Sequence, residues 1–419
     1  MSAVAAGPAV RRLADWSAAD LADLADEYGT PLYVTDLDRV RENAARLRSA
    51  FDVETTDTDV RYAVKAHTGR AVLETVRESG LGAECASAGE VVRALDAGYD
   101  AVQYTAVNPP AEDLDIVLDR WRDGAAVTVV AGAYDTVARL RERGFDGRLA
   151  IRVNPGVGAG HHEKVTTGGH AKFGVPYDRA AELVSDARAD FDVVGIHAHA
   201  GSGISGDDLD AHRELVSRMG ELARSVGPLE FVDVGGGFGV PYHEDEPPLD
   251  LPAVAEATKE ALGEVDATLA VEPGRYVVAD AGVLLTRVNT VKPVDDAGAT
   301  GQVPVVAGVD AGMTTLLRPA MYDAYHAVRN LTEERPERPV TVAGPVCETA
   351  DLFCEERPMP APRRDDLLAI GNAGAYGYEM ANTYNSRPRP AEVVCDGDET
   401  RLARERETLA GVTALEMER

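Results

Sequence analysis

Lysine is scarce in this chain. Five lysines stand among 419 residues that include 42 basic residues in all, so arginine carries most of the positive charge. The basic residues are also outnumbered by 71 acidic ones, which gives a formal net charge of −29 and disfavours nucleic-acid binding. Because the acidic residues are dispersed along the chain rather than gathered in a tail, we expect a halophilic protein whose self-repulsion is screened by concentrated salt.

Long apolar runs and paired cysteines are missing as well. No stretch approaches the roughly 18 apolar residues that a membrane helix needs. The segment 1–13 lacks the apolar core of a signal peptide, so we expect a cytoplasmic protein without a membrane partner. Cys85, Cys347, Cys354 and Cys395 have neither metal-type spacing nor the context of a disulfide scaffold, and reduced thiols are therefore expected.

From about residue 30 to 280, short β-branched runs alternate with amphipathic helical segments. The candidate strands are 61–64, 82–85, 101–105, 126–130, 149–153, 193–199, 231–234 and 269–272. Eight βα units over about 250 residues match a (β/α)₈ TIM-like barrel, whose chemistry collects at the C-terminal ends of the strands.

The pattern changes after residue 281. Strand-like runs at 283–294, 303–309, 340–346, 367–370 and 392–395 follow one another without long helices. We therefore predict an α/β chain in three parts: a segment 1–35 that packs with the C-terminal domain, a cofactor-binding barrel at 36–282, and a mainly β domain, a β-barrel or sandwich, at 283–419.

One of the few lysines lies where a charge is costly. Lys65 is near the end of the β-like run 60–66, and burying an ammonium there needs a chemical reason. A lysine at the C-terminal end of a buried strand that loses its proton near neutral pH can form a Schiff base. The alternative is an edge-strand lysine that reaches water, and this segment taken alone favours that alternative.

Glycine-rich and polar patches follow other strands. Gly235, Gly236 and Gly237 follow the seventh strand, and the run 272–275 (Glu-Pro-Gly-Arg) follows the eighth, so the two loops together form a candidate phosphate site.

The sixth strand ends in two histidines, His197 and His199, which could bind a metal. No acidic or cysteine ligand lies nearby in sequence, so we favour no metal and a His199 ring stacked on an aromatic cofactor, with the Ser202 hydroxyl on its phosphate. A phosphate, a stacking ring, a lysine and a carboxylate together indicate pyridoxal 5′-phosphate. Glu272 against the pyridine nitrogen would keep that nitrogen protonated.

These motifs resemble those of the barrel-type pyridoxal-phosphate decarboxylases. The resemblance rests on the runs 62–66, 197–202, 235–239 and 272–275. Within this group the chain is similar to the diaminopimelate decarboxylases over about residues 30–400, on the runs 152–156, 167–174, 318–322, 344–348 and 384–388.

The resemblance implies a role for each matching residue. Lys65 would form the internal aldimine, His199 would stack on the ring and Glu272 would contact its nitrogen, while Cys347 would donate a proton. The other expected cofactor contacts are Glu84, Ser202, Gly235, Gly236, Gly237, Gly274, Arg275 and Tyr376. The expected substrate contacts are Arg275, Arg318, Tyr322, Glu348 and Tyr376. In this family the cysteine loop reaches across a homodimer interface.

Two positions depart from the family pattern. Glu84 replaces a common aspartate with a carboxylate one methylene longer, and Thr349-Ala350-Asp351 replaces a common Ser-Gly-Asp. Both substitutions keep the acid but could shift the fit of the substrate.

The implied activity is that of a carboxy-lyase, the decarboxylation of meso-2,6-diaminopimelate to L-lysine and CO₂ in the last step of lysine biosynthesis. The far end of this substrate carries an ammonium and a carboxylate, and arginines, Tyr322 and Glu348 supply groups for both. Three alternatives stay open: a decarboxylase of ornithine, arginine or carboxynorspermidine; an amino-acid racemase; and a non-catalytic cofactor-binding protein, which would lack the second domain.

Overall fold

The structure is a computed structural model that describes residues 7–52, 57–157, 173–199, 201, 204, 209–293, 304–332 and 335–417. The chain divides into two compact units. Unit 1 comprises Met1–Val40, Pro241–Glu246 and Val278–Arg419, and unit 2 comprises Arg41–Val240 and Pro247–Val277. Among the helices in these described ranges, none combines the length and the apolar character that crossing a bilayer requires.

Unit 2 is a closed barrel of eight parallel strands. Its strands are β2 (Thr58–Ala63), β3 (Gly82–Cys85), β4 (Ala101–Ala106), β5 (Ala126–Ala131), β6 (Arg148–Asn154), β8 (Asp192–His197), β9 (Phe231–Asp233) and β10 (Thr268–Val271). They follow the order β5-β4-β3-β2-β10-β9-β8-β6, and the pairing of β5 with β6 closes the ring. The short β7 (Val175–Pro176) runs beside β6. The predicted TIM-like barrel is confirmed.

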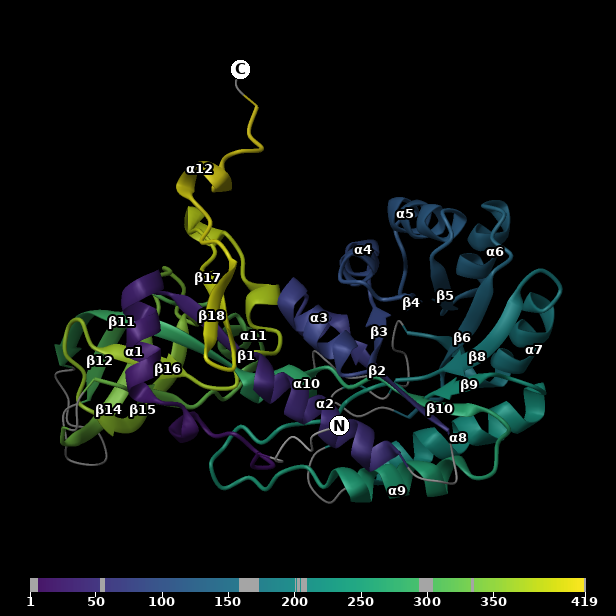
Figure 1. Cartoon of the computed structure of the whole chain (residues 1–419), viewed down its shortest axis with the longest axis horizontal. Coiled ribbons are helices and arrows are strands. Elements are labelled where there is room, and N and C mark those ends of the chain that lie inside the picture. Colours follow the sequence, from purple (N-terminus) through teal and green to yellow (C-terminus); the bar gives the residue numbers. More distant parts are fainter. Residues whose placement is uncertain are drawn as a thin grey trace. The chain divides into compact units, whose positions relative to one another are not determined.

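Helices connect the strands and lie outside them (Figure 1). They are α2 (Leu37–Phe51), α3 (Arg70–Glu78), α4 (Ala88–Asp96), α5 (Ala111–Arg122), α6 (Tyr134–Glu142), α7 (Tyr177–Ala187), α8 (Asp210–Val226), α9 (Leu251–Leu262) and the short α10 (Arg275–Val278). Local chemistry sets several of their ends. Ser87 Oγ accepts the Glu90 N–H at the start of α4, and Asp250 Oδ1 accepts the Ala253 N–H at the start of α9. Gly263, at φ +69°, ends α9.

The interior of the barrel is layered. Val130, Ala150, Val194, Phe231 and Ala270 form a buried apolar cluster. Gly195 leaves room for this layer, because a Cβ there would come within 2.6 Å of the Phe231 ring. The Arg61 guanidinium lies 4.3 Å above the same ring and begins a polar layer toward the C-terminal ends of the strands.

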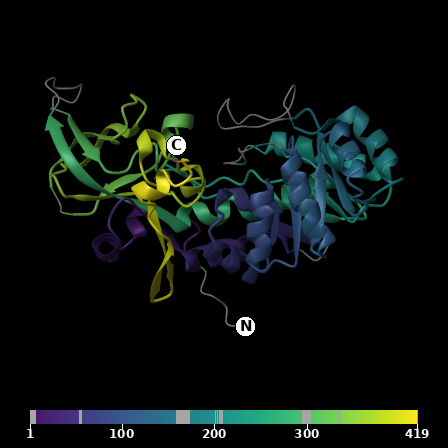
Figure 2. The ribbon, with the colours of Figure 1, turned by 90° about the horizontal axis from the view of Figure 1, so that it is seen from above.

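Unit 1 is a mainly β unit built on one sheet. Its path runs β15-β14-β12-β11-β1-β17-β18, while β16 pairs with β11 and β13. The strands are β1 (Leu32–Asp36), β11 (Gly282–Pro293), β12 (Val305–Val309), β13 (Val328–Asn330), β14 (Glu337–Ala343), β15 (Leu352–Pro360), β16 (Leu367–Ile370), β17 (Ala391–Asp396) and β18 (Glu399–Arg404). Figure 2 shows the β17–β18 hairpin in yellow. The helices of this unit are α1 (Ala18–Tyr28), α11 (Arg318–Tyr322) and α12 (Leu409–Val412).

The N-terminal segment of unit 1 lies within this sheet. β1 pairs antiparallel with β11 and parallel with β17. Trp16 and Leu21 pack in one apolar cluster with Leu32, which is fully buried. Arg39 adds a buried ion pair, with its Nη2 2.7 Å from Asp280 Oδ2.

Candidate active site

Lys65 lies just after β2, in the single 3₁₀ turn Val64–Ala66. Its Nζ is 3.0 Å from Glu84 Oε2, at the end of the neighbouring strand β3. The Lys65 side chain is 39% exposed and that of Glu84 1%, so the lysine is compensated by a buried carboxylate rather than desolvated alone. Burial opposes the ionisation of Glu84, but the charge of Lys65 and hydrogen bonds to the carboxylate together outweigh it, so the pKa of Glu84 is lowered.

His199 follows β8 and is fixed by the glycine loop after β9. Gly236 donates its N–H to His199 Nδ1 at 3.0 Å, so the neutral ring carries its hydrogen on Nε2. Desolvation, and then the charges of Lys65 and Arg152, lower the pKa of His199 well below its usual value. The imidazole is therefore neutral at pH 7, which suits a ring that stacks on an aromatic group.

The loop Gly235–Gly237 has no room for side chains. A Cβ at Gly235 would meet His199 Nδ1 at 2.5 Å, one at Gly236 would meet the Glu272 carbonyl oxygen at 2.2 Å, and φ at Gly237 is +106°. Gly235 also accepts the Glu272 N–H at 2.9 Å. The loop is thus held against the ends of β8 and β10, and its lack of side chains leaves room for an anion to approach the backbone.

The run Glu272–Arg275 after β10 is fastened to the turn that carries Lys65. Pro273 accepts the Ala63 N–H at 3.1 Å. A Cβ at Gly274 would come within 3.0 Å of the Ala63 Cβ, so glycine permits this approach. Arg275 is half-buried at the first position of α10. Ser202 and the run 167–172 lie outside the described residues.

Glu272 is buried in a polar network. Gln103 of β4 donates its amide nitrogen to Glu272 Oε1 at 2.7 Å and to Asp233 Oδ2 at 3.1 Å. His197 Nε2 lies 3.2 Å from the Glu272 carboxylate. On the other side, Arg61 Nη1 donates to Asp233 Oδ2 at 3.2 Å.

These buried acids have unusual protonation. Burial, and then the charge of Glu84, raises the pKa of Glu272 to about 7. Burial, and then the charge of Glu272, raises the pKa of Asp233 to about 7. Burial lowers the pKa of His197 to about 4, so its ring is neutral. The carboxyl pair therefore retains a proton near neutrality, as close buried carboxylates do.

The same three groups could hold a metal by geometry alone. One ligand atom each from His197, Asp233 and Glu272 lies within 4.8 Å of the others. The fold thus brings to His197 two acidic groups that are distant from it in sequence. The acidic oxygens, however, already accept hydrogen bonds from Gln103 and from the cationic Arg61. A guanidinium beside the ligand oxygens disfavours a bound cation, so the arrangement fits a hydrogen-bonded network better.

The other expected residues lie in unit 1. Among the four cysteines, all of which the structure describes, Cys347 alone is exposed. Asn385 Nδ2 is 3.5 Å from Cys347 Sγ, and the Tyr384 hydroxyl donates to Glu348 Oε1 at 2.5 Å. Cys347 and Glu348 thus share one exposed corner with the run 384–386.

Asp351 holds the cysteine loop in place. Its side chain is buried and accepts the Met313 N–H at 2.5 Å and the Val346 N–H at 2.7 Å. Gly312 and Gly344 are needed beside it, since a Cβ at either would come within 2.7 Å or less of its oxygens. The carboxylate therefore fixes the backbone immediately before Cys347.

Arg318, Tyr322 and Tyr376 have different surroundings. Arg318 is 3% exposed and donates Nη1 to the Tyr242 hydroxyl at 2.8 Å and to His326 Nε2 at 3.0 Å. Tyr322, the last residue of α11, is half-buried. Tyr376 is also half-buried, and its φ of +55° is a conformation that most side chains avoid.

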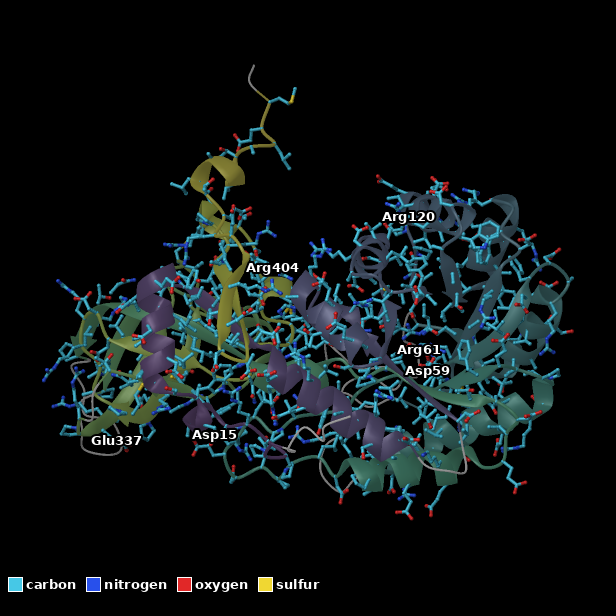
Figure 3. All side chains as sticks on the ribbon, in the orientation of Figure 1. Asp15, Asp59, Arg61, Arg120, Glu337 and Arg404 are labelled. Atoms are coloured by element: carbon cyan, nitrogen blue, oxygen red, sulfur yellow. The ribbon has the colours of Figure 1, made fainter. Side chains whose placement is uncertain are left out.

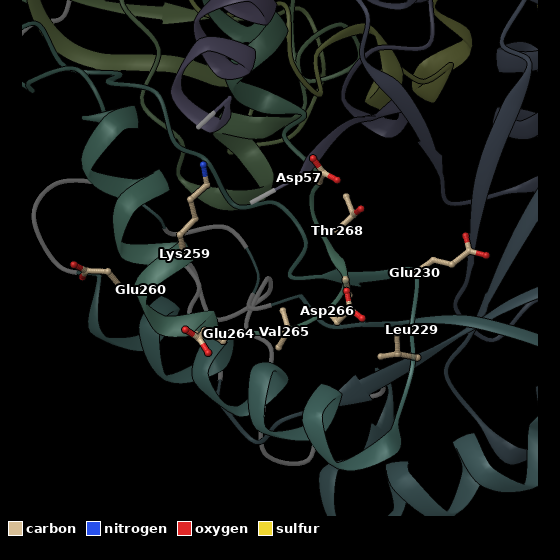
Figure 4. Close-up of a pocket in the computed structure, with 11 residues that line it drawn as sticks. Asp57, Leu229, Glu230, Lys259, Glu260, Glu264, Val265, Asp266 and Thr268 are labelled. Atoms are coloured by element: carbon tan, nitrogen blue, oxygen red, sulfur yellow. The ribbon is translucent and has the colours of Figure 1, made fainter. Parts of the chain in front are cut away.

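A large cavity lies at the opposite end of the barrel (Figure 4). It has a volume of about 940 Å³ and is lined from the N-terminal ends of β9 and β10 and from the end of α9. Its lining includes five acidic residues, Asp57, Glu230, Glu260, Glu264 and Asp266, against one cation, Lys259. An acidic wall repels phosphate, so this cavity does not compete with the glycine loop as the anion site.

The residues at the C-terminal strand ends fit pyridoxal phosphate. A lysine amine, a neutral imidazole, a glycine loop with no room for a Cβ and a buried carboxyl group all come from one barrel end. The family model described as "Pyridoxal-dependent decarboxylase, pyridoxal binding domain" matches residues 37–279. The fold and this match define the class as pyridoxal-dependent decarboxylases.

Individual proteins of known activity are similar over nearly the whole chain. A diaminopimelate decarboxylase of Methanothermobacter thermautotrophicus is 44% identical, with 94% of this chain and 92% of that protein covered. The Escherichia coli K12 diaminopimelate decarboxylase is 36% identical, with 96% and 97% covered. The crystal structure of the Helicobacter pylori diaminopimelate decarboxylase complexed with L-lysine has a TM-score of 0.86 at 32% identity, with 94% and 99% covered. The chain belongs to the diaminopimelate decarboxylase family.

Sequence reasoning missed several buried polar residues of the site. Gln103, Arg152 and Arg61 stand within barrel strands, and Asp233 precedes the glycine loop. Polar side chains at inward positions of a barrel strand were the available signal, because such residues are costly to bury without partners. The sequence signal for Asp351 was weaker: it is the acidic residue that this chain keeps in a cysteine loop that otherwise departs from the family pattern.

Proposed function

We propose that this protein decarboxylates meso-2,6-diaminopimelate to L-lysine and CO₂ with pyridoxal phosphate. The observation that carries the proposal is the convergence of Lys65, His199, the glycine loop and Glu272 at one barrel end, in a chain 44% identical to a diaminopimelate decarboxylase. The L-lysine in the similar Helicobacter pylori structure supports the proposed product.

Each barrel residue has a role that follows from its surroundings. Pyridoxal phosphate, when bound, supplies a conjugated ring that takes up the electron pair left when the bond between Cα and the carboxylate breaks. Lys65 anchors the cofactor covalently, and Glu84 stays ionised 3.0 Å from its nitrogen. His199, neutral and oriented by Gly236, packs on the ring, while the glycine loop, which has no side chains, lets the phosphate approach its backbone.

The residues of unit 1 are assigned to the substrate and to the final proton. Cys347 is the proton donor to Cα, which its exposure allows. Glu348 takes the distal ammonium, whereas Arg275, Arg318 and Tyr322 serve the distal carboxylate. Tyr376 contacts both the cofactor and the substrate. Arginine suits a carboxylate because its fork donates two hydrogen bonds at once.

We further propose that the working enzyme is a homodimer in which the Cys347 loop of one protomer completes the site of the other. The exposure of Cys347, Glu348 and Tyr384 on one corner of unit 1 supports this proposal, since an exposed thiol and carboxylate are accessible to a partner protomer.

We also propose a cytoplasmic protein adapted to high salt. The net charge of −29 supports the salt adaptation, because dispersed like charges repel and salt screens them. The thermal midpoint should rise between dilute buffer and molar KCl, and equal midpoints would contradict this part of the proposal.

Turnover of the purified protein tests the main proposal. CO₂ release should be rapid from meso-diaminopimelate and slow from lysine, ornithine and arginine. Lys65→Ala should lose the borohydride-trapped adduct, and Cys347→Ala should keep the adduct but lose most turnover. Cys395→Ala, a half-buried cysteine of the same unit, is the matched control. Rapid turnover of ornithine in place of diaminopimelate would replace the proposed substrate.

Mixing the two inactive variants tests the dimer. In a random one-to-one mixture of Lys65→Ala and Cys347→Ala, half of the dimers carry one intact site, so about a quarter of the wild-type activity should return. If each protomer supplied both groups to its own site, no activity would return.

A further inference from the structure

Behind Glu272, the barrel interior holds a second carboxylate that the proposed mechanism has not used. Asp233 ends β9 and is fully buried. Its Oδ1 accepts the Gly235 N–H at 2.9 Å, and its Oδ2 accepts from Gln103 at 3.1 Å and from Arg61 at 3.2 Å. One side chain therefore connects the glycine loop to the residues that surround Glu272.

Gln103 has one possible orientation in this network. Arg61 can only donate hydrogen bonds, and its Nη1 contacts the Gln103 amide oxygen. The amide nitrogen of Gln103 must then point to the opposite side, where it gives one hydrogen to Glu272 and the other to Asp233. Gln103 thus clamps the two carboxyl groups at a fixed separation.

Arg61 is itself held on two further sides. Its Nε donates to Asp59 Oδ2 at 2.8 Å, and its guanidinium rests 4.3 Å from the centre of the Phe231 ring. Figure 3 labels Arg61 and Asp59 on the same strand, β2. The orientation of the network is therefore set by a cation, Arg61, whose side chain is held in place by protein contacts alone.

We propose that Asp233, oriented by Gln103 and Arg61, is a positioning residue whose negative charge makes Glu272 a stronger base toward the cofactor ring nitrogen and so keeps that nitrogen protonated. The inference rests on the proposed contact of Glu272 with that nitrogen. Near neutral pH the two carboxyl groups share one proton, and passing that proton to the ring nitrogen would leave negative charges on Glu272 and Asp233 that balance the positive nitrogen and Arg61.

The charged and titratable groups around Glu272 come from five barrel strands or the turns that follow them. They are Glu84 on β3, Lys65 after β2, Arg152 on β6, His197 on β8, Arg61 on β2 and Asp233 on β9. Lys65 and Glu84 form an ion pair, and His197 is neutral near pH 7. Asp233 is linked to Glu272 through Gln103, and it shares its cation, Arg61, with Asp59.

The experiment is ¹⁵N NMR of ring-labelled pyridoxal phosphate bound to the full-length protein, recorded across pH. The wild-type nitrogen should show the protonated shift at pH 7. In Asp233→Asn, a change that keeps the shape and removes the charge, the pH at which the nitrogen loses its proton should fall by about one unit or more. The dissociation constant of the cofactor should rise about tenfold, because one favourable charge is lost in a poorly solvated site.

Two further variants complete the design. Gln103→Met keeps the volume and both charges but removes the clamp, and it should shift the nitrogen in the same direction by a smaller amount. This variant decides the question should Asp233→Asn fail to fold. Asp192→Asn, at the exposed N-terminal end of the neighbouring strand β8, is the matched control and should match the wild type.

The outcomes separate this inference from the proposed function. Wild-type shifts in both Asp233→Asn and Gln103→Met would overturn the role of Asp233 while leaving the decarboxylase untouched. An unprotonated nitrogen in the wild-type protein would overturn the role of Glu272 as well. Diaminopimelate turnover by the wild type, measured separately, tests the activity itself.

Discussion

Gly236→Ala adds one methyl group at the tightest point of the glycine loop. The new Cβ would lie 2.2 Å from the Glu272 carbonyl oxygen, whereas Cβ contacts under 3.0 Å are essentially never seen. The loop must therefore retreat from the end of β10 by at least about 0.8 Å, the difference between these two distances. This movement strains two hydrogen bonds, from Gly236 to His199 Nδ1 at 3.0 Å and from Glu272 to Gly235 at 2.9 Å.

Overpacking of this size costs about 1–3 kcal/mol. Because the loop lies on the proposed cofactor site, we expect the cost to fall mainly on cofactor binding, as a rise of about 5- to 150-fold in the dissociation constant. The assay is titration of the cofactor-free protein with pyridoxal phosphate, followed by the visible absorbance of the bound form. Thermal unfolding of the same cofactor-free samples measures the part of this free energy that destabilises the fold itself.

Gly89→Ala is the matched control, because a Cβ there meets nothing closer than Ser87 Oγ at 3.8 Å. Its helical position should make the change neutral or stabilising by up to about 1 kcal/mol. A cofactor dissociation constant for Gly236→Ala within twofold of the wild-type value, with normal stability, would refute the assignment of this loop to the phosphate.

Three further predictions concern other parts of the chain. Burial lowers the pKa of His212 to about 4, and its ring donates to Thr258, so the wild-type protein loses stability as the pH falls from about 6.5 toward 4. In urea titrations, the loss of unfolding free energy between pH 7 and pH 5 should be about 2 kcal/mol smaller in His212→Gln than in the wild type. An equal effect of His212→Gln at both pH values would contradict this linkage. Asp351→Asn replaces the oxygen that accepts the Val346 N–H with an amide group that donates, so turnover should fall at least tenfold while cofactor affinity stays the same. A parallel loss of cofactor affinity would show that the effect of the substitution is not confined to the cysteine loop. Arg39→Met leaves a buried carboxylate without its cation and should lower the free energy of unfolding by about 3–5 kcal/mol, and a loss under 1 kcal/mol in denaturant titrations would mean that the pair is solvated.

The barrel could be predicted because periodicity and composition agree in its strands. Parallel strands covered by helices are buried on both faces, so they read as short β-branched runs such as 126–131, between amphipathic helices. Each predicted strand end lies within three residues of the observed one. The largest difference is at β2, which starts at Thr58 and leaves Lys65 in the turn that follows.

Part of the mainly β unit was not visible in the sequence. β15 (Leu352–Pro360) contains two prolines and several charges, and β18 (Glu399–Arg404) is mostly exposed. Both lie at the ends of the sheet path, where a strand pairs on one side only. Edge strands tolerate proline and charge, which also protect the edge from pairing with other chains, so they lose the pattern that identifies a central strand.

The candidate site was predictable where its residues follow strands and unpredictable where they fill the barrel. Lys65, His199, Gly235 and Glu272 stand in loops, where an unusual residue or a glycine run is conspicuous. The partners of Glu272 come from strands far away in sequence, and Gln103 lies 169 positions from it. Such contacts depend on which strands face each other across the closed barrel, and the periodicity of the sequence does not indicate which strands these are.

The two glutamates of the site show what this arrangement achieves. Glu84 and Glu272 are both nearly fully buried, yet the pKa of Glu84 is lowered and that of Glu272 is raised to about 7. Burial does not distinguish the two glutamates, so their different pKa values must come from their neighbours. Glu84 faces the cation of Lys65, whereas Glu272 faces Glu84 and is bound, together with Asp233, by Gln103. One barrel end thus holds a permanent anion beside the proposed covalent anchor and, in the same polar layer, a carboxyl pair that retains a proton. Opposite shifts of this kind in neighbouring acids are what a site needs to stabilise one group charged and another ready to exchange its proton at the same pH.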